Sequence, residues 1–119
     1  MTRQRFEGLR MELLRKEVNN MKRETKLLKT KCRNDVRLIS ELQRYITPGD
    51  LECPEILESK VEEIREKLNQ IMQEWQTIYN CRLRYGATTA QMRYYEIIMR
   101  EYNRANRAIN IYKKMDVNK

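Results

Sequence analysis

Apolar side chains between residues 57 and 78 recur at alternating spacings of four and three positions. They are Leu57, Val61, Ile64, Leu68, Ile71, Trp75 and Ile78. Because seven residues complete nearly two helical turns, these side chains form one seam along a helix. Met72 and Tyr79 widen the seam on one flank, so the helix has more apolar surface than a two-stranded coiled coil covers. The pattern predicts a helix over residues 54–85 that packs against two neighbours.

A second heptad pattern predicts one long helix over residues 3–46. Its apolar positions are Met11, Leu14, Val18, Met21, Leu28, Cys32, Ile39, Leu42 and Ile46. Thr25 and Asp35 interrupt the pattern with polar side chains. The first half of the seam has charged flanks, whereas Val36 and Leu38 widen the second half. We therefore expect the second half to contact two helices and the first half to be less covered.

The segment Thr-Pro-Gly-Asp at residues 47–50 ends this helix. Proline disfavours helical geometry in the residue before it, and Pro-Gly is typical of a type II turn. Pro54 suits the first turn of the second helix, where its missing N–H is not needed. Asp50 is the better capping residue by type, but Cys53 is adjacent to the proline, so both stay open as the cap.

A third helix is predicted over residues 88–115. Gly86 is a natural end for a helix that reaches Tyr85, and Thr88 and Gln91 then have the spacing of a capping box. The apolar seam consists of Tyr95, Ile98, Tyr102, Ala105, Ile109 and Tyr112. Three helices joined by short connections predict an all-α fold, an antiparallel up-down-up three-helix bundle with long helices that forms a single domain.

The composition fits a helical, cytoplasmic protein. The 119 residues include only 3 Gly and 2 Pro, too few turn-forming residues for an all-β chain. The 3 cysteines lack the spacing of a disulfide framework, which indicates a reducing, intracellular setting. No apolar run reaches the roughly 18 residues of a membrane span, and the N-terminus lacks the apolar core of a signal peptide. We expect a cytoplasmic location, which includes the cytosolic face of a membrane.

The net charge of +8 is unevenly distributed. The first and third helices are basic and the middle one is acidic, an order that suits an acidic helix packed against two basic ones. Solvated helix faces account for most charge of this kind. The sharper interpretation is a basic surface for an acidic membrane surface or nucleic acid. Arginine and tyrosine alternate in the third-helix region, but no nucleic-acid recognition motif accompanies them.

The sequence offers little for catalysis. It contains no histidine, the commonest general base and metal ligand. Cys32 lies on the core seam of the first helix, where a small buried hydrophobe is expected rather than a nucleophile. Trp75 also occupies a core position, where packing is expected rather than ligand binding. No enzyme activity, cofactor or metal site is predicted.

Residues 93–103 resemble the last helix of the syntaxin N-terminal Habc domain of the SNARE family. The matching positions are Arg93, Tyr95, Ile98, Met99, Glu101, Tyr102 and Asn103. The resemblance implies a regulatory domain in vesicle fusion that binds a SNARE helix or a Sec/Munc-type protein, here without the SNARE motif or membrane anchor. It also implies that the Arg-Leu-Arg triplet at residues 82–84 begins the third helix. The second helix would then end near Thr77, whereas the glycine favours an end at Tyr85, and we keep the latter.

In such a domain a fourth helix would lie in a groove between two bundle helices. Apolar side chains expected beside the outer grooves are Val36, Leu38, Met72 and Met99, and Tyr94 falls off the third-helix seam. We predict these five as partner-binding residues. The basic first and third helices favour a partner with acidic flanks.

The alternative function is a structural coiled-coil subunit of a cytoskeletal or ciliary assembly. The narrow seam of residues 11–28 favours it, because a seam of this width suits pairing with one further helix, as in self-association. The two interpretations differ in shape: a compact monomer would support the syntaxin-like bundle, and an elongated dimer would support the coiled-coil subunit.

Overall fold

The computed structural model describes residues 3–84 and 86–117, with side chains from Glu7 to Tyr112 apart from residue 85. The described part holds three α-helices and no strand, which confirms the predicted all-helical, three-helix fold. The helices are α1 (Arg3–Gln43), α2 (Pro54–Ile78) and α3 (Thr89–Val117), with a 3-10 helix η1 (Pro48–Glu52) and a π-helical turn η2 (Tyr79–Leu83) between them. Within the described residues, no helix combines the length and apolar character needed to cross a membrane.

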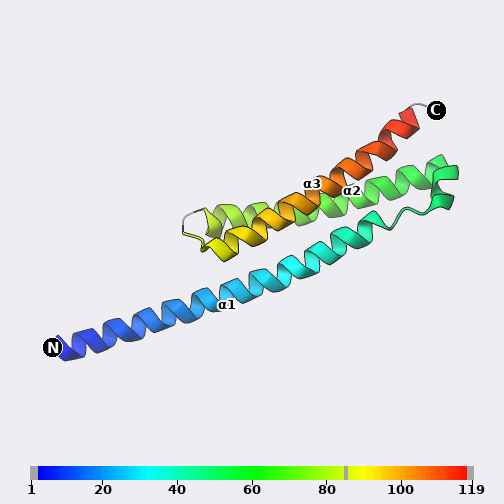
Figure 1. Cartoon of the computed structure of the whole chain (residues 1–119). Helices are drawn as coiled ribbons and strands as arrows, with labels where there is room; N and C mark the ends of the chain where they lie inside the picture. The colour runs from blue at the N-terminus through cyan, green and yellow to red at the C-terminus, as the bar shows by residue number, and fades with distance from the viewer. Residues whose placement is uncertain (1–2, 85, 118–119) are drawn as a thin grey trace.

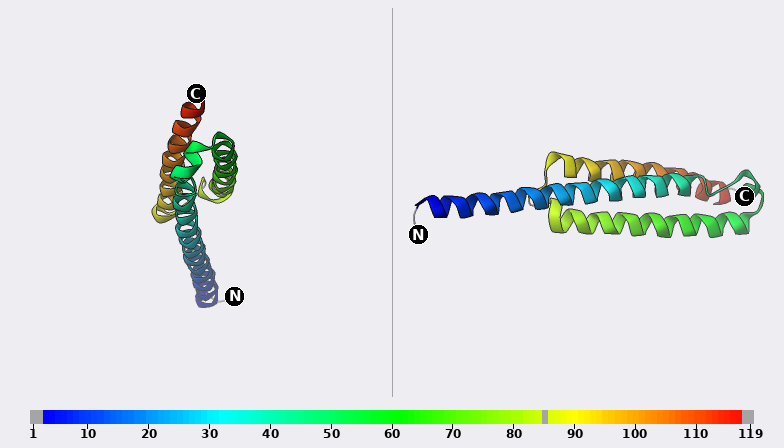
Figure 2. Two further views of the ribbon diagram at one scale, coloured as in Figure 1. Left: turned by 90° about the vertical axis from the view of Figure 1, so that its right-hand side faces the viewer. Right: turned by 90° about the horizontal axis from the view of Figure 1, so that it is seen from below.

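The molecule is a rod of about 80 × 20 × 18 Å. Helix α1 runs along one edge of it, and α2 and α3 form a helical hairpin beside the C-terminal half of α1 (Figures 1 and 2). The closed end of the hairpin, where α2 turns into α3, lies near the middle of α1. The N-terminal half of α1 therefore continues beyond the hairpin with no other element beside it.

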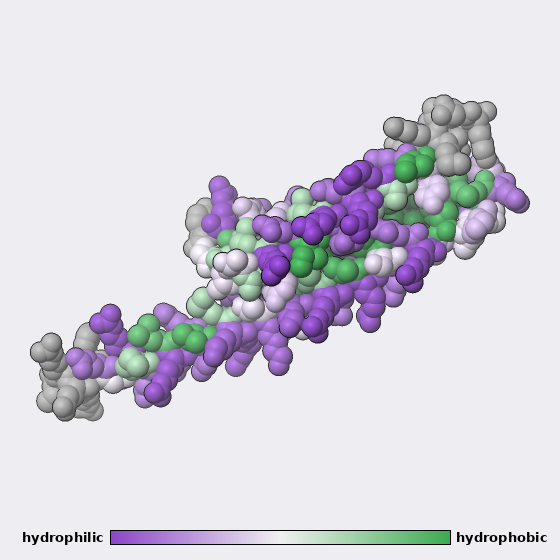
Figure 3. All heavy atoms as spheres, viewed as in Figure 1, coloured by the Kyte–Doolittle hydropathy of each residue, from purple (hydrophilic) through white to green (hydrophobic). Residues whose placement is uncertain are grey.

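We call residues 7–24 of α1 the α1 arm. Every residue of the arm is exposed. Its heptad positions Met11, Leu14, Val18 and Met21 are between 43% and 55% exposed. Figure 3 shows hydrophobic side chains, in green, among hydrophilic ones, in purple, on the part of the rod that leaves the bundle. The first half of α1 is thus less covered than the second, as the change in seam width predicts.

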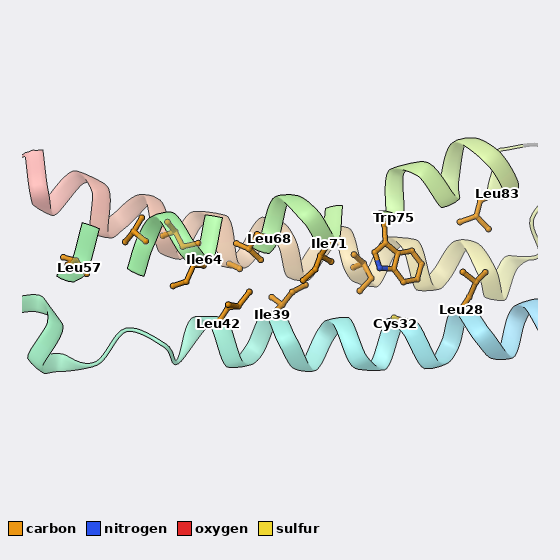
Figure 4. Packing of buried hydrophobic residues seen from close by; sticks show 14 residues of the cluster. Leu28, Cys32, Ile39, Leu42, Leu57, Ile64, Leu68, Ile71, Trp75 and Leu83 are labelled. Carbon is orange, nitrogen blue, oxygen red and sulfur yellow. The ribbon is translucent and has the colours of Figure 1, made fainter. Parts of the chain in front are cut away.

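The core occupies the length that α1 shares with the hairpin (Figure 4). Its largest fully buried side chains come from all three helices and are Trp75, Ile39, Ile64, Leu68 and Ile98. On α2 the heptad positions from Leu57 to Trp75 are buried, whereas Ile78 and Tyr79 are partly buried against the core. The α2 seam predicted from spacing is therefore the centre of the core.

Helix α1 ends at Gln43, three residues before the predicted end. The amides of Arg44 and Tyr45 bond to carbonyls three residues back, so the last turn tightens before the chain becomes extended at Thr47. Pro48 requires that extended geometry in the residue before it.

The predicted type II turn at Pro48-Gly49 is wrong, because Gly49 does not have the positive φ that such a turn requires. The segment forms η1 instead. The Asp50 amide donates to the Thr47 carbonyl at 3.0 Å, and the Thr47 amide donates to the Asp50 carboxylate at 2.9 Å. Asp50 therefore stabilises η1, and Cys53 is the N-cap residue of α2.

The second connection contains the predicted capping box. The Gln91 amide donates to the Thr88 hydroxyl at 3.3 Å, and the Thr88 amide donates to the Gln91 side chain at 3.2 Å. Gly86 has φ +145°, a conformation that favours glycine. Helix α2 keeps α-helical geometry to Ile78 and continues as η2 to Leu83, while the predicted end at Tyr85 lies outside the described residues.

Candidate functional site

A groove of about 460 Å³ lies between α1 and α2. It exists because each of these helices packs more closely against α3 than against the other. The apolar and aromatic side chains that line it are Leu38, Leu42, Tyr45 and Ile71, and the polar and charged ones are Asp35, Glu41, Glu63, Lys67, Gln70 and Glu74. Four of these are acidic and one is basic, so the groove combines an apolar floor with a net negative wall.

Leu38 is the most accessible apolar part of this groove. It lies on a flank of the α1 seam and is 44% exposed. Its neighbours Leu42 and Ile71 are buried in the core, so only part of their surface faces the groove. A ligand side chain placed on Leu38 would therefore extend the core outward rather than displace it.

A buried polar network lies at one end of the groove. The Trp75 indole donates to the Asp35 carboxylate at 2.6 Å, and both residues are buried. Lys31 lies 3.1 Å from the same carboxylate oxygen and 2.5 Å from Glu74. The Lys31 ammonium also lies 5.8 Å from the Trp75 ring centroid. Asp35, a polar residue on a core seam, thus has two donors at one carboxylate oxygen and links α1 to α2.

The lysine in this network stays charged. Burial alone would lower the pKa of Lys31, but hydrogen bonds to Glu74 and Asp35 and their negative charges outweigh it, so its pKa is raised. The positive charge neutralises part of the acidic wall where α1 and α2 meet. Glu74 is still 59% exposed, so it keeps surface for a further cation.

The other end of the groove is fixed by Tyr45 and Lys60. The Tyr45 hydroxyl donates to Glu63 at 2.7 Å, which raises the pKa of the phenol. Lys60 donates to the Tyr45 carbonyl at 3.2 Å and to Asp50 at 2.6 Å, and its ammonium lies 4.7 Å from the Tyr45 ring centroid. The bond from Lys60 lowers the pKa of Asp50. The first connection is thereby held against α2.

Cys32 is a buried titratable residue of the core. Burial, reinforced by the negative charge of Asp35, raises the pKa of the Cys32 thiol, which makes it a poorer nucleophile. Its Sγ donates weakly to the Tyr94 carbonyl at 3.7 Å. Among the residues that the structure describes, no group of Cys, Asp and Glu is arranged to hold a metal ion. What the groove offers a ligand is therefore apolar contact and negative charge.

The structure does not bring the five predicted partner-binding residues together. Leu38 lines the groove, whereas Val36 is partly buried against the core. Met72 is only 6% exposed, which leaves it out of reach of a partner in this conformation. Tyr94 is partly buried against the core, and Met99 is partly buried on α3, away from the groove residues.

Two features of the groove were not predicted, although heptad spacing contains the first of them. Heptad spacing places Val36 and Leu38 on opposite flanks of the α1 seam, so a single groove cannot take both. The acidic wall arises because Glu63 and Glu74 on α2 face the same opening as Glu41 on α1. A useful signal was Asp35 itself, since a core-seam carboxylate needs a donor and a buried tryptophan needs an acceptor.

Comparison of the chain with protein-family models, with curated proteins and with solved structures finds no match.

Proposed function

We propose that this chain is a non-enzymatic helical interaction module, an antiparallel up-down-up three-helix bundle that receives a further amphipathic helix between α1 and α2. The observation that carries the proposal is the groove, in which Leu38 and its apolar neighbours lie between acidic side chains of both helices. The apolar face of an amphipathic helix would cover Leu38, and basic residues on its flanks would pair with Glu41 and Glu74.

The resemblance of residues 93–103 to the syntaxin Habc domain gives this partner a class. It supports a regulatory domain in vesicle fusion, at the cytosolic face of a membrane, with a SNARE helix or a Sec/Munc-type protein as its partner. The charge of the groove indicates which charge the flanks of the partner helix should carry. Although α1 and α3 are basic overall, the groove itself is acidic. The flanks of the bound helix should therefore be basic, whereas the overall charge of the chain predicts acidic flanks.

Titration calorimetry with the whole chain tests this proposal. The ligands are a synthetic amphipathic helix with Lys and Arg flanks, its Glu-flanked counterpart, a panel of SNARE helices and Sec/Munc-type proteins. Leu38→Ser should weaken binding of the basic-flanked helix by roughly tenfold or more, because the apolar contact is lost. Leu27→Ser is the matched control, since Leu27 is 61% exposed on the same helix and does not line the groove.

The two leucine variants should keep the melting temperature of the parent, because both side chains are exposed. Raising the salt concentration should slow association more than it speeds dissociation. Equal loss of binding in Leu38→Ser and Leu27→Ser, or stronger binding of the Glu-flanked helix, would contradict the proposed groove.

A second candidate function is a coiled-coil subunit of a cytoskeletal or ciliary assembly. The exposed seam of the α1 arm favours it, because Met11, Leu14, Val18 and Met21 keep the core heptad register outside the bundle. A helix with an uncovered seam of this kind is stabilised by pairing with another helix. Sedimentation of an elongated oligomer supports this candidate, and a monomer at every concentration contradicts it.

A further inference from the structure

The seam of the α1 arm is the same seam that builds the core. Leu28 and Cys32, one and two turns beyond the arm, are buried by α2 and α3, whereas Val18 and Met21 are about half exposed. The register does not change between them, so the arm presents the surface that the hairpin covers farther along. An arm of 18 residues is about 27 Å long and is marginally stable as a lone helix.

The seam of the arm is self-complementary when two copies run in opposite directions. In antiparallel coiled coils the first core position of each heptad packs against the second core position of the partner helix. Met11 then lies opposite Met21 of the second copy, and Leu14 lies opposite Val18 of the second copy. A two-fold axis midway between these layers repeats both of them on its other side. The two copies therefore present the same surface to each other and form an isologous dimer.

The hairpin excludes the parallel alternative. Its closed end reaches Thr25, where the Gln91 side chain donates to the Thr25 hydroxyl at 3.1 Å. Packed helices lie about 8–10 Å apart, so a second α1 running parallel to the first would enter the space that α2 and α3 occupy beyond that point. In the antiparallel register Glu7 of the second copy is instead level with Thr25 at the closed end, so only the first turn of each α1, residues 3–6, extends past that point.

A hollow marks the place where the second arm would end. It has a volume of about 380 Å³ and is lined by Val18, Met21, Lys22, Thr25 and Thr88, at the junction of the arm and the hairpin. In the antiparallel register Met11 of the second copy lies over Met21, beside this hollow. Methionine is a flexible, apolar side chain that fills irregular gaps well.

We propose that the α1 arm pairs with the α1 arm of a second copy of this chain in an antiparallel dimer. This pairing rests on the coiled-coil candidate function and is independent of the groove between α1 and α2. The interface has about two heptads of each chain and is smaller than a standard protein interface, so the dissociation constant should be roughly 1–100 µM.

Charged flanks distinguish the two directions. In the antiparallel register Arg10 lies opposite Glu24 of the second copy at both ends, while the two copies of Arg15 meet at the dyad, as do the two copies of Glu17. A parallel pair would place Glu24 opposite Lys29 of the second copy and Arg10 opposite Arg15 of the second copy. Reversing the charge of Arg10 alone should therefore weaken an antiparallel pair and strengthen a parallel one.

Sedimentation equilibrium of the whole chain across the micromolar range tests the dimer. Leu14→Glu should weaken dimerisation by roughly a hundredfold, because each interface then buries two unpaired charges. Its matched control is Leu13→Glu, since Leu13 is 63% exposed and lies off the seam. Both variants should keep the melting temperature and should bind the basic-flanked helix as the parent does, because neither residue lies in the core or the groove.

Charge exchange tests the register. Arg10→Glu and Glu24→Arg should each weaken dimerisation by about threefold to tenfold, and the double variant should restore it. A monomer throughout, a dimer that Leu14→Glu leaves intact, or a dimer that Arg10→Glu strengthens would each overturn the proposal. If the dimer is contradicted while the chain still binds the basic-flanked helix, the groove proposal is unaffected.

Discussion

Leu68→Ala should lower the free energy of unfolding by about 2–5 kcal/mol. Leu68 is 1% exposed at the centre of the α2 seam, where it packs within the cluster that joins all three helices (Figure 4). Truncation removes its apolar contacts and leaves a cavity that rigid helices on both sides cannot fill completely. Urea unfolding monitored by circular dichroism measures the change.

The control for Leu68→Ala is Leu13→Ala on the α1 arm. The same atoms are removed from a helix, but Leu13 is 63% exposed and lies outside the core. Its unfolding free energy should stay within about 0.5 kcal/mol of the parent. Similar effects of the two substitutions would contradict the assignment of the core to the part of α1 that the hairpin covers.

Trp75→Phe should destabilise the bundle by about 1.5–3 kcal/mol. The substitution keeps an aromatic ring in the core but removes the indole donor from the buried Asp35 carboxylate, 2.6 Å away. Asp35→Leu alone should also destabilise, because it leaves the buried indole N–H without an acceptor. The double variant replaces both polar partners with apolar groups and should be more stable than the sum of the single effects predicts.

Urea unfolding of the four proteins in this cycle measures the coupling between Asp35 and Trp75. We expect a coupling of about 0.5–3 kcal/mol, the range for residues in direct contact. Strictly additive effects would show that the hydrogen bond between α1 and α2 contributes nothing specific to stability.

The parts of the fold that depend on local periodicity are predictable from the sequence. The α2 seam from Leu57 to Trp75 and the capping box of Thr88 and Gln91 are both present in the structure. Each is set within a few turns of one helix, where spacing alone determines which side chains share a face. The turn at Gly49 was predicted wrongly, because Asp50 makes side-chain bonds that a Pro-Gly pattern does not reveal.

The candidate site depends on how the helices are placed, and spacing does not determine that. Leu38 was predictable as a flank residue of α1, but two of the acidic side chains that line its groove, Glu63 and Glu74, belong to α2, more than twenty residues away in the sequence. Met72 was predicted to lie beside an outer groove, yet it belongs to the wider part of the α2 seam, which the second neighbour of α2 covers. Burial of a flank residue thus depends on how many helices contact it.

In the proposed dimer one heptad seam on α1 is covered twice, by the hairpin within the chain and by a second copy along the arm. Amide hydrogen exchange of the whole chain, measured well below and well above the dimer dissociation constant, tests it most directly. At the lower concentration residues 28–42 should be protected and residues 11–21 should exchange rapidly. At the higher concentration residues 11–21 should become protected while residues 28–42 stay unchanged. Protection of residues 11–21 that is strong at the lower concentration, or absent at both, would contradict the account.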